Sequence, residues 1–202
     1  MVRISPRVDF AFKLIFEAHK DLLMGLINAV VSKEDEVKDI IIKNPYTSKK
    51  GKADKFAVLD IKAQSVSGTW YNIEVQVAED LAYDKRALYY WSKVYSEQLQ
   101  AGQPYKDLQK TIGIHVLNFS VLEEEDYHNI FHVTNDKTKR RLSHMMELHF
   151  IELPKVSEDL SQIKTALDRW AVLLARAERY TQKTLPKALS KDSLIQKAMA
   201  VL

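Results

Sequence analysis

The sequence predicts an α/β fold, and three observations support this prediction. Apolar residues recur at helical spacing near both ends of the chain and again in its middle. Two segments of alternating polarity flank Ser65-Val66-Ser67-Gly68, which is typical of a β-hairpin. A continuous apolar run over 111–119 is typical of a buried strand. We therefore expect a sheet in the middle of the chain, with helices before, between and after its strands.

The N-terminal part of the chain is expected to form two helices and a short strand. Phe10 and Leu14 fall on one face at helical spacing, which predicts a first helix over 9–18. The apolar pattern predicts a second helix from about 21 to 31. A β-branched run within 37–43, followed by Asn-Pro, predicts the first strand.

The hairpin is the clearest strand pair, and its strands are expected over 56–64 and 69–77. A three-residue loop, 66–68, joins them, with Gly68 in the left-handed conformation that such a turn requires. Beyond the hairpin, apolar spacing predicts a helix over 81–100, and a further strand pair is expected over 128–134 and 145–153. From residue 160 apolar residues again recur at helical spacing, and this pattern continues to the last residue.

The composition restricts the classes of function. The chain has 202 residues, of which 46% are hydrophobic and 28% charged, as in a globular protein. It contains no cysteine, which excludes disulfides, zinc-thiolate sites, iron–sulfur clusters and a thiol nucleophile, and which fits a cytoplasmic location. The longest apolar run, 22–31, is far too short to cross a bilayer. The six histidines do not suggest a dedicated metal site, because His128 and His132 lie far apart along one predicted strand.

Positive charge is concentrated locally although the net charge is only +3. The basic segments are 45–62, 137–141 and 160–202. Such segments are either solvated loops and helix faces or surfaces that contact phosphates.

The hairpin places two carboxylates opposite each other. Because Ser65 faces Thr69 across the turn, each step back along the first strand matches a step forward along the second, so Asp60 faces Glu74. Like charges at that separation destabilise a sheet. A divalent cation would compensate, and Mg²⁺ takes one or two protein carboxylates while keeping waters for a phosphate substrate. The alternative is a solvated hairpin face whose charges are balanced by neighbouring lysines, and a slip of one residue in register would separate the pair.

The order of five short segments resembles that of a known family. The sequence resembles the Rpn-type recombination-promoting nucleases, also described as transposases, of the PD-(D/E)XK superfamily. The resemblance covers about residues 5–155 and continues more weakly beyond. The segments that carry it are Asp9-Phe10-Ala11-Phe12-Lys13, Leu22-Leu23 with Leu26-Ile27-Asn28-Ala29-Val30, Leu59-Asp60-Ile61-Lys62-Ala63, Asn72-Ile73-Glu74-Val75-Gln76 and Arg86-Ala87-Leu88-Tyr89-Tyr90-Trp91-Ser92-Lys93.

The resemblance implies a fold, an arrangement of domains and a reaction. The fold would be a PD-(D/E)XK, restriction-endonuclease-like core with a mixed central sheet flanked by helices. We expect this core over 1–155 and a helical extension, cut short at its end, over 156–202. The reaction would be hydrolysis of DNA phosphodiester bonds with Mg²⁺, for which Mn²⁺ would substitute. DNA is then the expected partner, no membrane is involved, and a homodimer would suit double-strand cutting.

The resemblance also assigns roles to residues of the hairpin. Asp60 and Glu74 would be the metal-binding carboxylates, joined by the backbone carbonyl of Val75. Gln76 stands where the superfamily commonly has lysine. A neutral amide is neither a general base nor a cationic stabiliser, so Gln76 would orient the attacking water and leave its activation to the metal.

Five accessory residues are further candidates for the site. Arg86 and Tyr90, one turn apart, would hold a phosphate, or Arg86 would instead make a structural ion pair. Asp9 and Lys13 match the family, although Asp9 is better explained as a helix cap than as a ligand. Glu17, one turn beyond Lys13, is a candidate third acid.

Two classes of function follow from these observations. The first is a metal-dependent endonuclease associated with recombination or mobile elements. The alternative is a catalytically inactive module that keeps the nuclease fold and binds nucleic acid or a partner protein. Convergence of Asp60 and Glu74 in the fold would favour the first.

Overall fold

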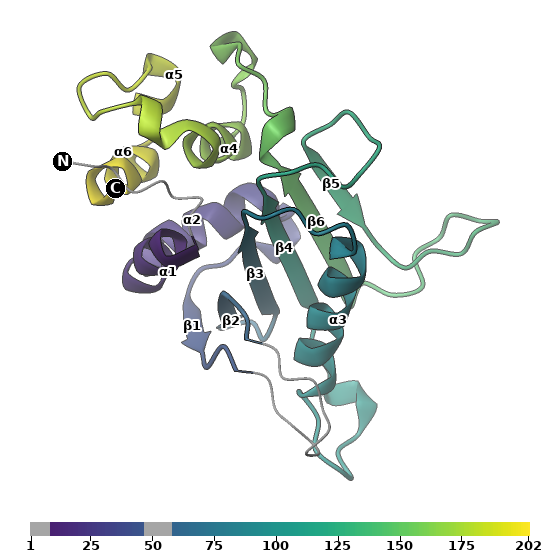
Figure 1. The fold of residues 1–202 in the computed structure, drawn as a ribbon. Helices are drawn as coiled ribbons and strands as arrows, with labels where there is room; N and C mark the ends of the chain where they lie inside the picture. The colour runs from purple at the N-terminus through teal and green to yellow at the C-terminus, as the bar shows by residue number, and fades with distance from the viewer. Residues whose placement is uncertain (1–8, 47–57) are drawn as a thin grey trace.

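A six-stranded sheet forms the centre of the protein, in the order β1-β2-β3-β4-β6-β5. The computed structural model describes residues 9–46 and 58–202 (Figure 1), so most of the basic segment 45–62 lies outside the described residues. The strands are β1 (Ile40–Lys43), β2 (Ile61–Ser65), β3 (Trp70–Gln76), β4 (Thr111–Leu117), β5 (His128–Phe131) and β6 (Met146–Glu152). β3, β4 and β6 run parallel, whereas β1, β2 and β5 pair antiparallel with their neighbours. The expected mixed sheet is confirmed.

The predicted hairpin forms with the predicted register. Gln64 pairs with Trp70 and Ile61 with Ile73, which is the alignment set by Ser65 facing Thr69. Gly68 has φ +101°, a conformation that glycine adopts without steric cost. The first strand is shorter than predicted because regular pairing with β3 begins only at Ile61.

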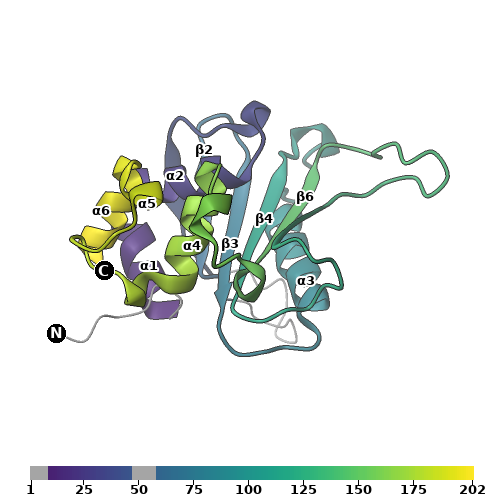
Figure 2. The ribbon, with the colours of Figure 1, turned by 90° about the horizontal axis from the view of Figure 1, so that it is seen from above.

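Helices cover both faces of the sheet (Figure 2). On one face lie α1 (Asp9–Ala18), α2 (Lys20–Val30), α4 (Ala166–Arg176) and α6 (Ser193–Val201), whose apolar side chains form one core with those of the sheet. Within β3, the side chains of Tyr71, Ile73 and Val75 belong to this core. The even-numbered side chains of β3, Glu74 among them, therefore point toward the opposite face.

The opposite face is covered by α3 (Tyr83–Ser96), which connects β3 to the parallel strand β4. A smaller apolar cluster holds it there, formed by Tyr83, Ala87 and four residues of the sheet side. The helix is shorter than the predicted 81–100, since it begins at Tyr83 and is capped at Glu97. The site face of the hairpin therefore lies beneath α3.

The C-terminal helices pack onto the N-terminal ones. Trp170 of α4 is buried against Phe16 of α1, with ring centroids 5.8 Å apart. Helix α4 starts at Ala166 rather than at the predicted residue 160, because Thr165 and Asp168 form a capping box that fixes the helix start. A short helix, α5 (Lys187–Ser190), precedes α6. Among the described residues, no helix is both long enough and apolar enough to cross a membrane.

Candidate active site

Asp60 and Glu74 lie together where β2 and β3 meet. Asp60 directly precedes β2, and Glu74 lies within β3 with its side chain on the α3 face. The backbone N–H of Asp60 donates to Glu74 Oε1 over 3.3 Å, and the N–H of Val75 donates to Asp60 Oδ2 over 2.8 Å. Both residues are buried, with exposed fractions of 9% and 2%. The hairpin register therefore brings the two predicted carboxylates into direct proximity.

The electrostatics of this carboxylate pair are unfavourable for two negative charges. Burial raises the pKa of Glu74 well above its ordinary value, and the negative charge of Asp60 raises it further. The Asp60 N–H and the cations Arg86 and Lys13 offset only part of this rise. Lys13 of α1 lies with its Nζ 3.2 Å from Asp60 Oδ1. The pair thus attracts positive charge from two separate helices.

The donor chemistry of the pair fits a hard divalent cation. Carboxylate oxygens are the ligands that Mg²⁺ and Mn²⁺ prefer, and a site with two of them leaves other positions for water and phosphate oxygens. Among the described residues, no group of three or more His, Asp or Glu side chains is arranged to hold a metal. A cation at Asp60 and Glu74 would therefore have to complete its coordination with backbone oxygens, water or substrate.

Arg86 extends from α3 beside the pair. Its guanidinium lies 5.1 Å from the ring centre of Tyr90 and 5.8 Å from that of Tyr83, so it is held between two aromatic faces. Its NH1 is 4.0 Å from Asp80 Oδ2, which is a loose ion pair. Its Nε is buried and has no hydrogen-bond partner among the described residues. A surface hollow is lined by Asp80, Ala82, Lys85, Arg86, Tyr89 and Tyr90.

Gln76 lies at the end of β3, on the same face as Glu74. Its side chain is partly exposed, and its Nε2 donates to the carbonyl of Ala78 over 3.2 Å. It is therefore closer to the surface than Glu74, and its amide is held by the chain that leads into α3.

The three candidates on α1 have different positions. Lys13 reaches the carboxylate pair, as described above. Asp9 is the first residue of α1, and its side chain lies outside the described part of the structure. Glu17 lies exposed on α1, one turn beyond Lys13. Of these three, only Lys13 has a described contact with the pair.

Sequence reasoning missed one buried residue beside Glu74, the histidine His115. His115 is directly opposite Glu74 in the parallel pairing of β3 with β4, and it is fully buried. Its Nδ1 lies 3.1 Å from the hydroxyl of Tyr83, while its Nε2 has no hydrogen-bond partner among the described residues. Burial, with a smaller contribution from the charge of His149, lowers the pKa of His115 to about 3, so this histidine is neutral at physiological pH. The only sequence signal was a histidine inside an otherwise apolar strand.

Unpaired polar atoms gather on this face of the sheet. Asn72 is completely buried, and among the described residues neither its Oδ1 nor its Nδ2 has a hydrogen-bond partner. It lies two residues before Glu74 on the same side of β3. Buried polar groups usually bind protein groups or ordered water, so the unpaired amide of Asn72 is an exception within this site.

A second polar cluster lies at the far edge of the sheet. Glu147 of β6 accepts from His149 Nε2 at 2.7 Å and from Lys110 Nζ at 3.0 Å, and it lies 3.2 Å from His132 Nε2. His149 in turn lies 2.9 Å from His128 through ring nitrogens. The carboxylate of Glu147 thus links His128 and His149 to His132. Lys110 shares Oε2 of this carboxylate with His132.

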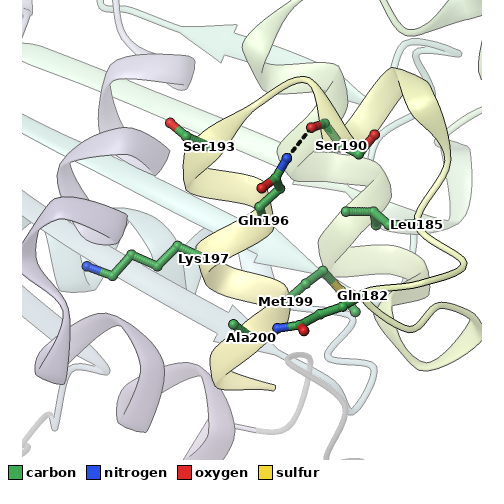
Figure 3. A pocket seen from close by; sticks show the side chains of 8 residues that line it. All are labelled: Gln182, Leu185, Ser190, Ser193, Gln196, Lys197, Met199 and Ala200. Atoms are coloured by element: carbon green, nitrogen blue, oxygen red, sulfur yellow. Dashed lines mark hydrogen bonds between the residues drawn. The ribbon is translucent and has the colours of Figure 1, made fainter.

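A pocket among the C-terminal helices does not resemble a reaction centre (Figure 3). It is lined by Gln182, Leu185, Ser190, Ser193, Gln196, Lys197, Met199 and Ala200. Gln196 donates to the backbone carbonyl of Ser190, and Lys197 points away from the pocket toward Asp21, at 2.6 Å. The lining carries no carboxylate or imidazole, so the carboxylate pair is the better candidate site.

Comparison with protein families gives a match over most of the chain. A family model described as PD-(D/E)XK nuclease family transposase matches residues 6–202. No curated protein and no solved structure matches the chain. The matched range includes the hairpin, α3 and the C-terminal helices.

Proposed function

The chain belongs to the PD-(D/E)XK nuclease family transposases, and from this membership we propose that it is a metal-dependent endonuclease that hydrolyses DNA phosphodiester bonds. The observation that carries the proposal is the buried pair Asp60 and Glu74, in which burial and then the negative charge of Asp60 raise the pKa of Glu74. Clusters of this kind cost stability and are typical of functional sites.

We propose that Asp60, Glu74 and the carbonyl of Val75 hold Mg²⁺, or Mn²⁺ in its place. A bound divalent metal would act as a Lewis acid on a phosphoryl oxygen and lower the pKa of a coordinated water. The protein's own contribution is to fix both carboxylates in place. The N–H of Val75 binds Asp60 and the N–H of Asp60 binds Glu74, while the cations Arg86 and Lys13 offset part of the rise in the pKa of Glu74.

The remaining candidates would position the substrate and water. Arg86, braced by Tyr83 and Tyr90, presents a planar donor that suits a phosphate. Gln76 cannot accept a proton from water as a base does, but its amide can orient a water molecule beside the carboxylate pair. Lys13, which lies beside Asp60, is a further cation that would contact a phosphate oxygen of the substrate. Asp9 and Glu17 remain lesser candidates on the same helix.

We propose that the protein takes part in recombination or in the movement of a mobile element. It would act on duplex DNA as a homodimer. We propose that residues 1–155 form the catalytic core and 156–202 a helical extension packed on it. The contact between Phe16 and Trp170 supports an extension that shares the core of the first two helices.

A cleavage assay tests the proposed function. The purified chain is incubated with supercoiled DNA in Mg²⁺, in Mn²⁺ or in a chelator, and nicked and linear products are measured. Asp60→Asn and Glu74→Gln should each lower the rate by at least about 10³-fold, as expected when a group acts in the transition state. Glu123→Gln, which removes an exposed carboxylate, is the matched control.

Two outcomes would contradict the proposal. Equal cleavage by wild type and by the variant carrying both substitutions would exclude the carboxylate pair as the active site. A wild type that binds DNA and cuts it with neither metal would favour the alternative, a binding module with a nuclease fold.

A further inference from the structure

The connection between β5 and β6 stands away from the body of the protein (Figures 1 and 2). We call residues 132–145 the basic arm. Every residue from 133 to 144 is exposed, and the arm continues outward from the two strands at the edge of the sheet. A segment that buries so little surface gains almost nothing from the hydrophobic core.

The basic arm nevertheless has a defined backbone. Thr134 and Arg141 form an antiparallel bridge, and the N–H of Leu142 donates to the carbonyl of Val133 over 2.9 Å. At the tip, the side chain of Asn135 accepts hydrogen bonds from the N–H groups of Lys137 and Thr138, at 3.0 and 2.9 Å. These bonds close the arm into a narrow two-stranded ribbon with a tight turn.

The charge of the basic arm is strongly one-sided. It carries Lys137, Lys139, Arg140 and Arg141 against the single acid Asp136. None of the four cations is ion-paired with an acidic side chain in the described part of the chain. Elsewhere, Lys62, Lys110, Lys155 and Arg169 all have carboxylate partners. Cations that repel one another on an exposed ribbon point to a negatively charged partner outside the protein.

We propose that the basic arm binds the phosphate backbone of duplex DNA, at a distance from the carboxylate pair. This inference rests on the proposed function, which supplies the DNA. A two-stranded ribbon has the width that a major groove admits, and lysine and arginine side chains on it reach the flanking phosphates. Such contacts hold and orient the duplex and do not select a base sequence.

The sheet places the arm within reach of the same duplex. Glu74 pairs with His115, His115 with Phe150, and Phe150 with Asn129, so one row of residues crosses from the site to β5. Strand spacing and the length of an extended chain put the tip of the arm roughly 30 to 40 Å from Glu74. That separation is close to one turn of B-DNA, about 34 Å.

Binding of a fluorescent DNA duplex to the full chain tests this inference. The duplex is about three helical turns long so that it spans both positions, and a chelator prevents cleavage. The arm variant combines Lys137→Gln, Lys139→Asn and Arg140→Gln, with asparagine at 139 because that residue has φ +56°, which asparagine tolerates well. The matched control removes three exposed lysines of the C-terminal region by Lys183→Gln, Lys187→Gln and Lys191→Gln.

The expected result is a loss confined to the arm variant. Three lost phosphate contacts should reduce the slope of log K against log salt by about 2.7 and weaken binding roughly 10- to 100-fold at about 0.15 M salt. The control should bind like wild type, and both variants should melt at the wild-type temperature. Affinity of the arm variant equal to that of wild type would overturn the inference, as would equal losses in the two variants.

Two further results separate this inference from the proposed function. DNA that is bound through the arm and never cut with Mg²⁺ or Mn²⁺ would refute the nuclease activity and support the arm. Competition by polyglutamate as effective as that by DNA would overturn the inference, because the arm would then recognise acidic chains in general.

Discussion

The repulsion between Asp60 and Glu74 predicts that Glu74→Gln makes the protein more stable while abolishing its proposed activity. Directly opposed strand residues have Cβ atoms about 5 Å apart. Two unit charges at that separation repel each other by about 3 kcal/mol at an effective dielectric constant of about 20. The substitution also removes the attraction of Glu74 to Lys13 and Arg86, which offsets part of this gain. In the wild type the Asp60 N–H donates to Glu74 Oε1 over 3.3 Å, and glutamine keeps an oxygen that can accept this bond. Its amide N–H group can also donate to the Asp60 carboxylate.

We expect a net stabilisation of about 1 to 2 kcal/mol at pH 8, which is about 2 to 8 °C in melting temperature for a chain of this size. The effect should depend on pH. The pKa of Glu74 is raised in the fold, so its favourable contribution is complete below the unfolded value of about 4.5 and is lost as pH rises through the folded pKa. Glutamine does not titrate, so the difference between variant and wild type should vanish near pH 4.5 and grow toward pH 8.

Urea denaturation in a chelator at pH 4.5 and pH 8 measures this difference for wild type, Glu74→Gln and the control Glu123→Gln. The exposed control should change the free energy of unfolding by less than about 0.5 kcal/mol at either pH. Adding Mg²⁺ should stabilise the wild type and have little effect on Glu74→Gln, because only the wild type keeps both proposed ligands. A variant that is less stable than wild type at pH 8, or a difference that does not change with pH, would refute the reasoning.

Three other predictions concern the site and the C-terminal helices. Gln76→Ala should lower kcat about tenfold without shifting the metal concentration needed for half-maximal rate, since one water-orienting hydrogen bond is lost; an unchanged rate would exclude that role. Because burial lowers the pKa of His115 to about 3, its contribution to stability is present above the ordinary value of 6.5 and is lost as pH falls. Wild type should therefore lose about 2 kcal/mol between pH 7 and pH 5 that His115→Asn does not lose, as measured by urea titration. Asp168→Ala removes both the capping box with Thr165 and the acceptor of the Tyr127 hydroxyl at 2.5 Å, so the free energy of unfolding should fall by about 1 to 3 kcal/mol. A thermal melt checks this, with Thr165→Ala as the smaller loss of about 1 kcal/mol.

The facing of Asp60 and Glu74 was determined by the sequence alone. Strand alternation has a period of two residues, and a three-residue turn ending in Gly68 permits one register, so the alignment follows from about fifteen consecutive residues. The helices and strands were predicted for the same reason, because their periodicity is local. Their ends were less well predicted, since a capping box such as that of Thr165 and Asp168 overrides the apolar pattern.

What surrounds the carboxylate pair was decided only by the tertiary structure. Lys13 reaches Asp60 from a helix far back in the chain, and His115 comes to lie beside Glu74 because α3 returns the chain to a parallel strand. No local periodicity encodes which strand becomes the neighbour or which side chains then lose contact with water. Burial raises the pKa of Glu74 and lowers that of His115, and burial is a property of the assembled layers. The sequence therefore determined that Asp60 faces Glu74. The packing of the layers determined the pKa values of Glu74 and His115.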